Sequence, residues 1–524
     1  MLKKELSTEQ LSILNHVGNI VVLAKPGSGK TFTISEKIKK IISEELLEYE
    51  GVIAISYTNK ASKELKDRVL KDCNSYKGCY FNTMDTFLLT EIVYLFGQHV
   101  FGNLDKDLEV FSKDEIDIDK YKNKVDTNKN KILEELFRDG IIILDCLTEI
   151  SIYIIKNSKS CMEYLRARYK YIFIDEYQDC GKYQHELFLE MVNLGMIGVA
   201  VGDIDQSIYK FSGKDSKYLL ELSNNDIFQA FVLNKNYRCH QSIIDYSTKF
   251  INKNHKINNN VDSRVFHLNI EGTQKNICKF IDKNITKVKE KYDIENNSDI
   301  AILVRGDTTG SIVNMNLKTA HKYFITTDLD KNSSVWCQVF KRILTFLLND
   351  ENIYEIVEDY FEIEDKNFEV LYHELEKIKQ AEEYKIEYFI NIANIIYPDK
   401  KSEEAVEILD KVIKNDELFY SYKSADNNEI QIMSIHKSKG LEFKIVFHLD
   451  LYKYIMPSYR PVCGIWEYDD IQQCKNLHYV AITRAIEACF MITSTSRYNS
   501  NNEIKNGVPS EFLYINSLQS YRKS

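Results

Sequence analysis

The chain is poor in the residues that mark several classes of protein. Its 524 residues include only 5 prolines and 19 glycines, which argues against long disordered linkers. Its 11 cysteines are scattered without a C-x-x-C pair, and the spacing from Cys73 to Cys79 suits neither a zinc site nor an iron–sulfur cluster. We therefore expect reduced, mostly buried thiols.

Long apolar runs and an excess of positive charge are also missing. No run of about 18 apolar residues occurs, and Met1-Leu2-Lys3-Lys4-Glu5 is not followed by an apolar signal core, so we expect a cytoplasmic protein without a membrane anchor. The net charge of −10 gives no global sign of nucleic-acid binding, but such binding needs only a local basic groove. The length predicts roughly two to four domains.

The strongest motif is a glycine-rich turn between an apolar strand and a helix. The run Asn19–Leu23 predicts a buried strand, and the apolar spacing over Phe32–Ile42 predicts a helix. Between them lie Ala24, Lys25, Pro26, Gly27, Ser28, Gly29, Lys30 and Thr31. This order is typical of a phosphate-binding loop, in which Lys30 reaches the β- and γ-phosphates and Thr31 ligates Mg²⁺. For this stretch alone, an ordinary Gly/Ser turn is the alternative.

Two further apolar runs end in acidic or amide residues. Tyr171–Ile174 predicts a central parallel strand and leads into Asp175 and Glu176, while Gly198–Gly202 precedes Gln206. Carboxyl ends of such strands are where α/β sheets place their ligands. Asp175 can hold Mg²⁺, Glu176 can orient and deprotonate water, and Gln206 could contact a γ-phosphate. The alternative for the acidic pair is a solvated helix start.

Other predicted strands lead into residues suited to nucleic acid. Tyr57, Thr58 and Asn59 stand between a strand and a helix, where a phosphate or a simple helix cap would equally explain them. Tyr209 and Phe211 could stack on bases, at about 1–3 kcal/mol per base, or could be core aromatics.

Two more residues have open alternatives. Gln10 could read an adenine edge with its amide, although a helix cap at Ser7 or Thr8 explains the same stretch. Arg238 follows a short predicted strand and could reach a phosphate through charge-assisted contacts.

In this order the motifs resemble those of the UvrD/Rep/PcrA family of superfamily 1 DNA helicases. The segments that carry the resemblance are residues 10, 24–31, 57–60, 175–179, 201–209, 236–238, 301–305, 432–443 and 478–485. They span nearly the whole chain in family order.

The resemblance implies an α/β fold of two RecA-like P-loop NTPase domains with reduced, mostly helical accessory insertions. It divides the chain into residues 1–90 plus 169–240 for the first RecA-like domain, 91–168 for one insertion, 241–330 plus 425–524 for the second RecA-like domain, and 331–424 for the other insertion.

The resemblance also implies roles for single residues, with ATP and Mg²⁺ as cofactors. Catalytic roles would fall to Lys30, Glu176, Gln206, Arg238 and Arg484, the two arginines acting as arginine fingers. ATP would contact residues 24–31 with Gln10 and Tyr237 at adenine and Glu442 at ribose, and Thr31 and Asp175 would hold the metal. Single-stranded DNA would run past Tyr57, Thr58, Asn59, Thr83, Tyr209, Phe211 and His436.

Five positions depart from the family pattern, and two of them, Lys25 and Pro26, occupy loop positions that are usually small. Phe32 stands where close relatives carry an arginine beside adenine, and Phe211 stands where a tryptophan is usual. Ser212 replaces an arginine, which would weaken one contact in the DNA path.

The insertions are shorter than in full-size helicases of this family. In length and trimmed insertions the chain resembles the helicase-like B subunit of the Gabija anti-phage system, which works with an OLD-family nuclease. This implies a hetero-oligomer with such a nuclease, acting on single-stranded DNA or DNA ends.

Two hypotheses remain open on sequence. One is an autonomous motor that moves 3′ to 5′ on single-stranded DNA and unwinds duplex, as in DNA repair. The other is a DNA-sensing ATPase that regulates a partner nuclease. A P-loop kinase or GTPase-like switch has no use for His436 or Arg484, and too few residues follow Ala485 for an appended nuclease domain.

Overall fold

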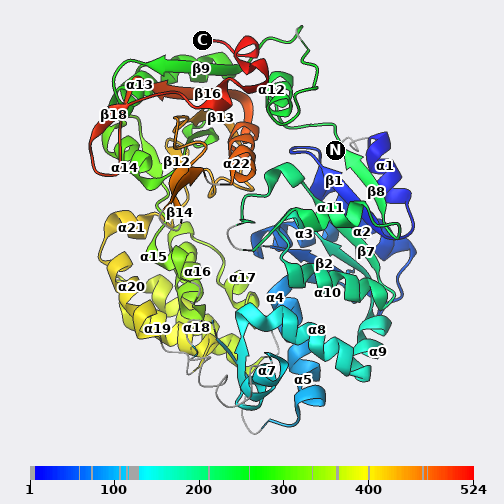
Figure 1. Cartoon of the computed structure of the whole chain (residues 1–524). Helices are drawn as coiled ribbons and strands as arrows, with labels where there is room; N and C mark the ends of the chain where they lie inside the picture. Colours follow the sequence, from blue (N-terminus) through cyan, green and yellow to red (C-terminus); the bar gives the residue numbers. More distant parts are fainter. Residues whose placement is uncertain are drawn as a thin grey trace.

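Two six-stranded parallel sheets form the framework of the molecule, and helices cover both faces of each (Figure 1). The predicted α/β class is confirmed. The computed structural model describes the chain except for residues 1–5, 58, 72, 74, 105–107, 112, 114–115, 117–128, 211–212, 259, 333, 362–364, 399–401, 463–464 and 469.

The first sheet has the strand order β3-β2-β6-β7-β1-β8. Its strands are β1 (Ile20–Ala24), β2 (Gly51–Ser56), β3 (Tyr80–Thr83), β6 (Tyr169–Ile174), β7 (Ile197–Gly202) and β8 (Gln229–Leu233). Because side chains alternate along a strand, Val21 and Ile53 join the core under one face, while Val22 and Val52 join the core under the other. Near-continuous apolar runs are therefore buried on both faces.

Helices of the first domain pack on these two cores. The helices α1 (Thr8–Asn15), α2 (Lys30–Glu44) and α3 (Asn59–Leu70) bury Ile13, Ile38 and Leu65 against one face. The helices α10 (Lys182–Asn193) and α11 (Lys217–Ser223) bury Leu187, Phe188 and Leu219 against the other.

The second sheet repeats this plan with the strand order β11-β12-β10-β13-β16-β9. Its strands are β9 (Val265–Ile270), β10 (Ile300–Val304), β11 (His321–Tyr323), β12 (Ile430–Ser434), β13 (Phe443–His448) and β16 (Ala485–Ser494). One face carries α12 (Gln241–Ile251) and α22 (Ile471–Thr483), and the other carries α13 (Gln274–Tyr292) and α14 (Asp307–Asn316).

The residues between β3 and β6 include the predicted insertion, 91–168. They contain α4 (Met84–Phe87), the π-helix Leu88–Val93, α5 (Tyr94–Phe101), α7 (Lys129–Arg138), α8 (Leu147–Asn157) and α9 (Lys159–Arg168). The resemblance implies a mostly helical insertion, and two short strands are the exception to it. The strands β4 (Glu109–Phe111) and β5 (Ile141–Ile143) pair in parallel, because the β-branched run of three isoleucines favours an extended chain.

The second insertion is helical in its described part and has its own hydrophobic core. Its helices are α15 (Asp328–Lys331), α16 (Val335–Asn349), α17 (Ile353–Glu358), α18 (Lys366–Gln380), α19 (Ile386–Ile396), α20 (Glu403–Ile413) and α21 (Asp416–Tyr420). Trp336 and Phe340 lie at the centre of that core. An ion pair of 2.6 Å joins Glu355 of α17 to Lys63 of α3, so this insertion touches the first domain.

Two short hairpins complete the second domain. They are β14 (Tyr459–Val462) with β15 (Ile465–Tyr468), and β17 (Ser496–Tyr498) with β18 (Ile504–Asn506). Short 3-10 turns follow β6 at Tyr177–Asp179 and β7 at Ile204–Gln206. Across the described residues, we find no helix with the length and apolarity needed to cross a membrane.

Candidate functional site

The glycine-rich turn links the end of β1 to the start of α2, as its sequence predicts. Gly27 and Gly29 adopt φ values of +65° and +76°, in the left-handed region that favours glycine. A Cβ on Gly27 would lie only 2.6 Å from Oδ1 of Asn236, so no larger residue fits there. The buried hydroxyl of Ser28 has no hydrogen-bond partner in the described part of the chain. An unmet polar group beside a helix N-terminus suits a phosphate ligand.

The segment that follows β8 holds this loop in place. Asn236 donates from Nδ2 to the carbonyl of Pro26 at 2.7 Å, and the amide of Tyr237 donates to the carbonyl of Gly27 at 2.8 Å. Oδ1 of Asn236 in turn accepts from the amide of Arg238 at 2.7 Å. Asn236 belongs to a segment that carries the family resemblance, but the sequence analysis gives it no role. Asparagine directly after a strand often bonds a nearby backbone amide, and this tendency is the sequence signal that could have pointed to it.

Gln10 lies over the loop and also caps its own helix. Its Oε1 accepts from the amide of Ser7 at 3.0 Å, which completes a capping box, so the predicted cap is confirmed. Its Nε2 faces the loop, 3.0 Å from where a Cβ of Gly29 would lie. The half-exposed ring of Tyr237 lies beside the same point, 4.0 Å away. Gln10 and Tyr237 thus converge on one side of the loop.

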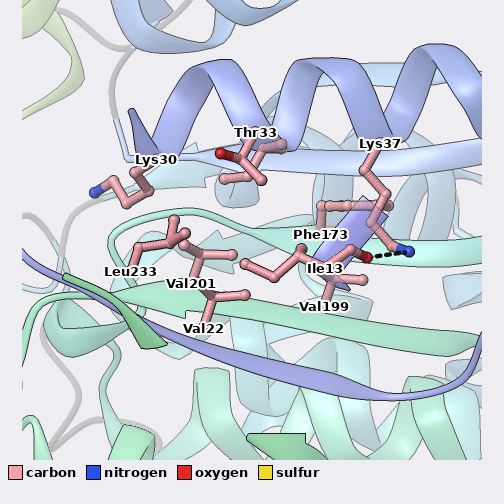
Figure 2. Close-up of a pocket in the computed structure, with 10 residues that line it drawn as sticks. Ile13, Val22, Lys30, Thr33, Lys37, Phe173, Val199, Val201 and Leu233 are labelled. Atoms are coloured by element: carbon pink, nitrogen blue, oxygen red, sulfur yellow. Dashed lines mark hydrogen bonds between the residues drawn. The ribbon is translucent and has the colours of Figure 1, made fainter. Parts of the chain in front are cut away.

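A small cavity of about 10 Å³ lies between α2 and the first sheet (Figure 2). Figure 2 shows Lys30 at one end of it and Lys37 of α2 at the other, with the Lys37 side chain turned towards Ile13. Nζ of Lys37 donates to the carbonyls of Ile13 at 3.1 Å and His16 at 2.8 Å, at the end of α1. Burial lowers the pKa of Lys37 to about 8. Lys37 therefore ties the helix that carries Gln10 to α2.

Lys30 meets the two acids that end β6. Its Nζ lies 3.1 Å from Oδ1 of Asp175 and also bonds Oε1 of Glu176. Burial raises the pKa of Asp175 although Lys30 opposes it. Burial also acts to raise the pKa of Glu176, but Lys30 and Lys439 outweigh it and lower this pKa to about 2. The structure thus brings together the predicted lysine, metal ligand and base.

Thr31 and Asp175 are the predicted metal ligands. Thr31 is the second residue of α2, and Asp175 directly follows β6. The described residues contain no cluster of three or more His, Cys, Asp or Glu side chains that could hold a metal ion. Such a cluster is not needed for Mg²⁺, which binds one or two protein oxygens together with substrate phosphates and water. The residues present fit that ligand type.

Gln206 connects the first sheet to Arg484 of the second domain. Its Nε2 donates to Oδ2 of Asp203 at 2.7 Å, and its Oε1 accepts from Nη2 of Arg484 at 2.6 Å. Arg484 is 2% exposed, and burial together with the neighbouring Arg238 lowers its pKa to about 10. Two predicted site residues from distant parts of the sequence are therefore in direct contact.

Lys439 is a residue of this site that sequence reasoning missed. Its Nζ pairs with Oδ2 of Asp179 and donates to the carbonyl of Gln206 at 3.1 Å. Both charged side chains are nearly buried. Lys439 belongs to the quoted segment 432–443, but its partner lies in the other domain, and sequence spacing carries no sign of that pairing.

Arg238, predicted to act as an arginine finger, forms an ion pair with Glu442, predicted to contact the ribose. Nε of Arg238 lies 2.6 Å from Oε2 of Glu442. Lys25, a loop residue, pairs with Asp205 at 2.5 Å. In this structure the charged groups of the cleft therefore neutralise one another.

The predicted DNA residues that can be placed follow the carboxyl ends of strands. Tyr57 follows β2, Thr83 ends the neighbouring β3, Tyr209 follows β7, and His436 follows β12 of the second sheet. The rings of Tyr209 and His436 lie 6.3 Å apart. Thr58 and Phe211 lie outside the described residues, and Asn59 is placed only as the first residue of α3.

Two family models match the chain. The UvrD/REP helicase N-terminal domain matches residues 6–142 and 118–226, and the UvrD-like helicase C-terminal domain matches residues 338–496. The chain belongs to the UvrD-like helicase family. The two RecA-like P-loop domains implied by the resemblance are thereby confirmed, and this UvrD-like helicase is an enzyme of the hydrolase class.

Named relatives are similar over nearly the whole chain. Gabija protein GajB of Bacillus cereus (strain VD045) is 27% identical over 94% of this chain and 96% of its own length. A probable DNA helicase II homolog of Rickettsia conorii (strain ATCC VR-613 / Malish 7) is 25% identical over 96% and 94%. The ATP-dependent DNA helicase PcrA of Staphylococcus aureus (strain MRSA252) is 22% identical over 98% and 86%.

The chain is similar in length to one relative and shorter than another. The alignment with PcrA extends over 638 residues, whereas that with GajB extends over 525. Since this UvrD-like helicase has 524 residues, it lacks segments that PcrA carries and shares its compact size with GajB.

Proposed function

We propose that the chain hydrolyses ATP in the cleft between its two sheets and uses the cycle to move on single-stranded DNA, 3′ to 5′. The contact between Gln206 and Arg484 carries this proposal, since it joins the sheet that holds Lys30 to the second domain at 2.6 Å. A cleft with groups from both domains can close on a γ-phosphate and transmit that closure.

The residues of the first domain would hold ATP. Backbone amides of the loop and Lys30 would bind the phosphates, and Gln10 and Tyr237 would hold the adenine. Thr31 and Asp175 would ligate Mg²⁺, which when bound neutralises phosphate charge.

Lys30 gives the site a way to activate its base only when ATP is present. In this structure Lys30, together with Lys439, keeps the pKa of Glu176 at about 2, which makes Glu176 a weak proton acceptor. Phosphates would draw Lys30 away from Glu176, and the pKa of the carboxylate would then rise towards a value suited to accepting a proton from water. Arg238 and Arg484 would stabilise the charge that develops on the transferred phosphoryl group.

A helicase assay tests the motor. We expect single-stranded DNA to stimulate ATP hydrolysis and a duplex with a 3′ tail to be unwound. A duplex with only a 5′ tail is the matched control, because a 3′-to-5′ motor loaded on it moves off the single strand without meeting the duplex. Absence of DNA stimulation would refute the DNA motor, and unwinding only from the 5′ tail would refute the direction.

We further propose that this motor is the helicase-like subunit of an anti-phage complex with an OLD-family nuclease. The compact length shared with the relative named Gabija protein GajB supports this role. Co-expression with a nuclease encoded next to this chain should give a complex on size-exclusion chromatography. A strictly monomeric protein without such a neighbour would contradict it.

The second candidate is an autonomous DNA-repair helicase, favoured by the relatives named DNA helicase II homolog and PcrA. Full unwinding by the isolated chain, with no gain from a nuclease partner, would decide for this candidate.

A further inference from the structure

Lys214 lies among the candidate DNA residues with its charge unpaired. Its Nζ is 5.0 Å from the ring centroid of Tyr57 and 5.5 Å from that of Tyr209. Within the described ranges, Lys214 makes no ion pair with a carboxylate. Nearby lysines differ in this respect, since Lys210 pairs with Asp470 at 2.7 Å and Lys439 pairs with Asp179. A cation held by two ring faces remains available to an anion.

The backbone around Lys214 is bonded to the segment Cys180–Gly181, which also bonds the hydroxyl of Tyr57. Lys214 forms an isolated β-bridge with Gly181, and the next residue donates its amide to the carbonyl of Cys180 at 3.1 Å. Sγ of Cys180 accepts the hydroxyl of Tyr57 at 2.9 Å. The stem of Lys214 and the ring of Tyr57 thus keep a constant spacing, and only the flexible side chain of the lysine needs to move.

Lys214 also reaches the third candidate DNA element. Burial raises the pKa of Asp85, and Lys214 is the cation that opposes this rise. Asp85 lies two residues after Thr83, in α4. Rings that follow β2 and β7 therefore flank this ammonium group, and the carboxyl group of Asp85 lies within its electrostatic reach.

We infer that Lys214 is a phosphate-binding residue of the DNA path, an inference that rests on the proposed DNA motor. With a net charge of −10, the chain needs local cations to hold a nucleic acid. Ser212 replaces the arginine expected from the family pattern, and Lys214 places a positive charge two residues further on.

On DNA binding, Lys214 would exchange its contacts with the two rings for a contact with a phosphate. Without DNA, the ammonium occupies the faces of Tyr57 and Tyr209. A DNA phosphate carries a full negative charge and attracts the ammonium more strongly than a ring quadrupole does. Once Lys214 turns to the phosphate, the face of Tyr57 becomes free for a base to stack on, while Lys439 stays 4.8 Å from the ring of Tyr209.

The salt dependence of DNA binding tests the inference. Binding of the full chain to labelled oligodeoxythymidine is followed by fluorescence anisotropy over a series of salt concentrations. Loss of one phosphate contact in Lys214→Gln should reduce the slope of log K against log salt by about 0.7 in magnitude, and weaken binding about fivefold at 0.1 M salt. Lys214→Arg should keep the wild-type slope.

Lys217→Gln is the matched control. It removes the same charge three residues away, from a lysine that lies 4.9 Å from the ring of Tyr218 on α11. This variant should keep the wild-type slope, and thermal unfolding of both glutamine variants checks that they fold. A wild-type slope in Lys214→Gln would overturn the inference while leaving the DNA motor intact. A wild-type chain that does not bind the oligonucleotide would overturn both.

Discussion

Glu176 combines a strained backbone with an unusually acidic carboxyl group. Its φ of +55° lies in the left-handed region, which costs a residue other than glycine about 1 kcal/mol or more. The turn Tyr177–Asp179 starts directly after it, and Nε2 of Gln178 donates to Oε2 of Glu176. The two carboxylate oxygens of Glu176 thus have different partners, since Oε2 accepts from Gln178 and Oε1 pairs with Lys30.

At this scale we predict that Glu176→Gln separates ATP binding from hydrolysis. The amide keeps the size of the side chain but cannot accept a proton from water, so turnover should fall about 10²- to 10⁴-fold. ATP binding should persist, because Lys30 remains available to the phosphates. Phosphate release and binding of a fluorescent ATP analogue measure the two effects.

Lys30→Ala is the companion variant and should lose both properties, since it removes the cation that would bind the phosphates. Near-normal turnover in Glu176→Gln would exclude Glu176 as the base. Equal loss of ATP binding in both variants would show that Glu176 acts structurally.

At the scale of elements, α1 and α2 are joined by a single buried lysine. Lys37 is 4% exposed, and its Nζ donates two hydrogen bonds to carbonyls at the end of α1. The dipole of α1 favours a cation at this end of the helix. The folded-state pKa of about 8 lies below the ordinary value of 10.5. Between these two pH values the unfolded chain holds a proton that the folded chain has released.

We therefore predict that the wild type gains stability relative to Lys37→Met as pH rises from about 8 to 10.5. The unfolded state binds more protons in this window, so the free energy of unfolding rises with pH, by up to about 3 kcal/mol in total. Thermal unfolding of both proteins across this pH range measures the difference.

Lys39→Met is the matched control, because it removes a lysine of the same helix that pairs with Glu36 within that helix at 2.9 Å. A stability difference between the wild type and Lys37→Met that does not change with pH would contradict the assignment of the low pKa to Lys37.

Sequence reasoning recovered those elements whose signal is local. The strand predicted before Tyr57 is β2, and the runs before Lys30 and Asp175 form β1 and β6. Apolar runs that end in glycine or acid are sufficient for such a prediction. The sequence does not predict the hydrogen bonds from Lys37 to α1, because a single lysine in a helix is normally expected to be solvated.

At the scale of the whole molecule, the two sheets meet through polar contacts. Nδ2 of Asn476 donates to the carbonyl of Ser207 at 2.9 Å, and Nε2 of Gln473 donates to the carbonyl of Ile208 at 2.8 Å. The contact between Arg484 and Gln206 belongs to the same boundary. Beside these polar contacts, the buried side chain of Ile208 packs in the hydrophobic core of the second domain. The polar contacts can exchange partners when the domains move relative to each other, as a motor requires.

The order of the family motifs predicts that Arg484 and Gln206 both belong to the ATP site. It does not predict that their side chains are in direct contact. Nor could it supply the pair of Lys439 and Asp179, which are 260 positions apart in the sequence. Pairing across a domain boundary depends on how the two sheets are oriented, and this orientation leaves no periodic pattern in the sequence.

The pair of Lys439 and Asp179 should couple the two domains energetically. Their side chains are only 11% and 6% exposed, so either single variant, Lys439→Gln or Asp179→Asn, leaves one buried charge unpaired and should destabilise the chain by about 3–5 kcal/mol. The double variant removes both charges and should recover about 1–3 kcal/mol of the summed loss. Thermal unfolding of the four proteins gives this coupling energy.

The exposed pair of Lys210 and Asp470 crosses the same boundary and supplies the control cycle. Its side chains are 56% and 29% exposed, so its coupling should stay below about 1 kcal/mol. If the coupling energies of the two pairs were equal, burial would not be what strengthens the inner pair. If the effects of Lys439→Gln and Asp179→Asn simply added, the domains would not be coupled through this contact, and closure of the cleft would depend on the other contacts across the boundary, among them that of Arg484 with Gln206.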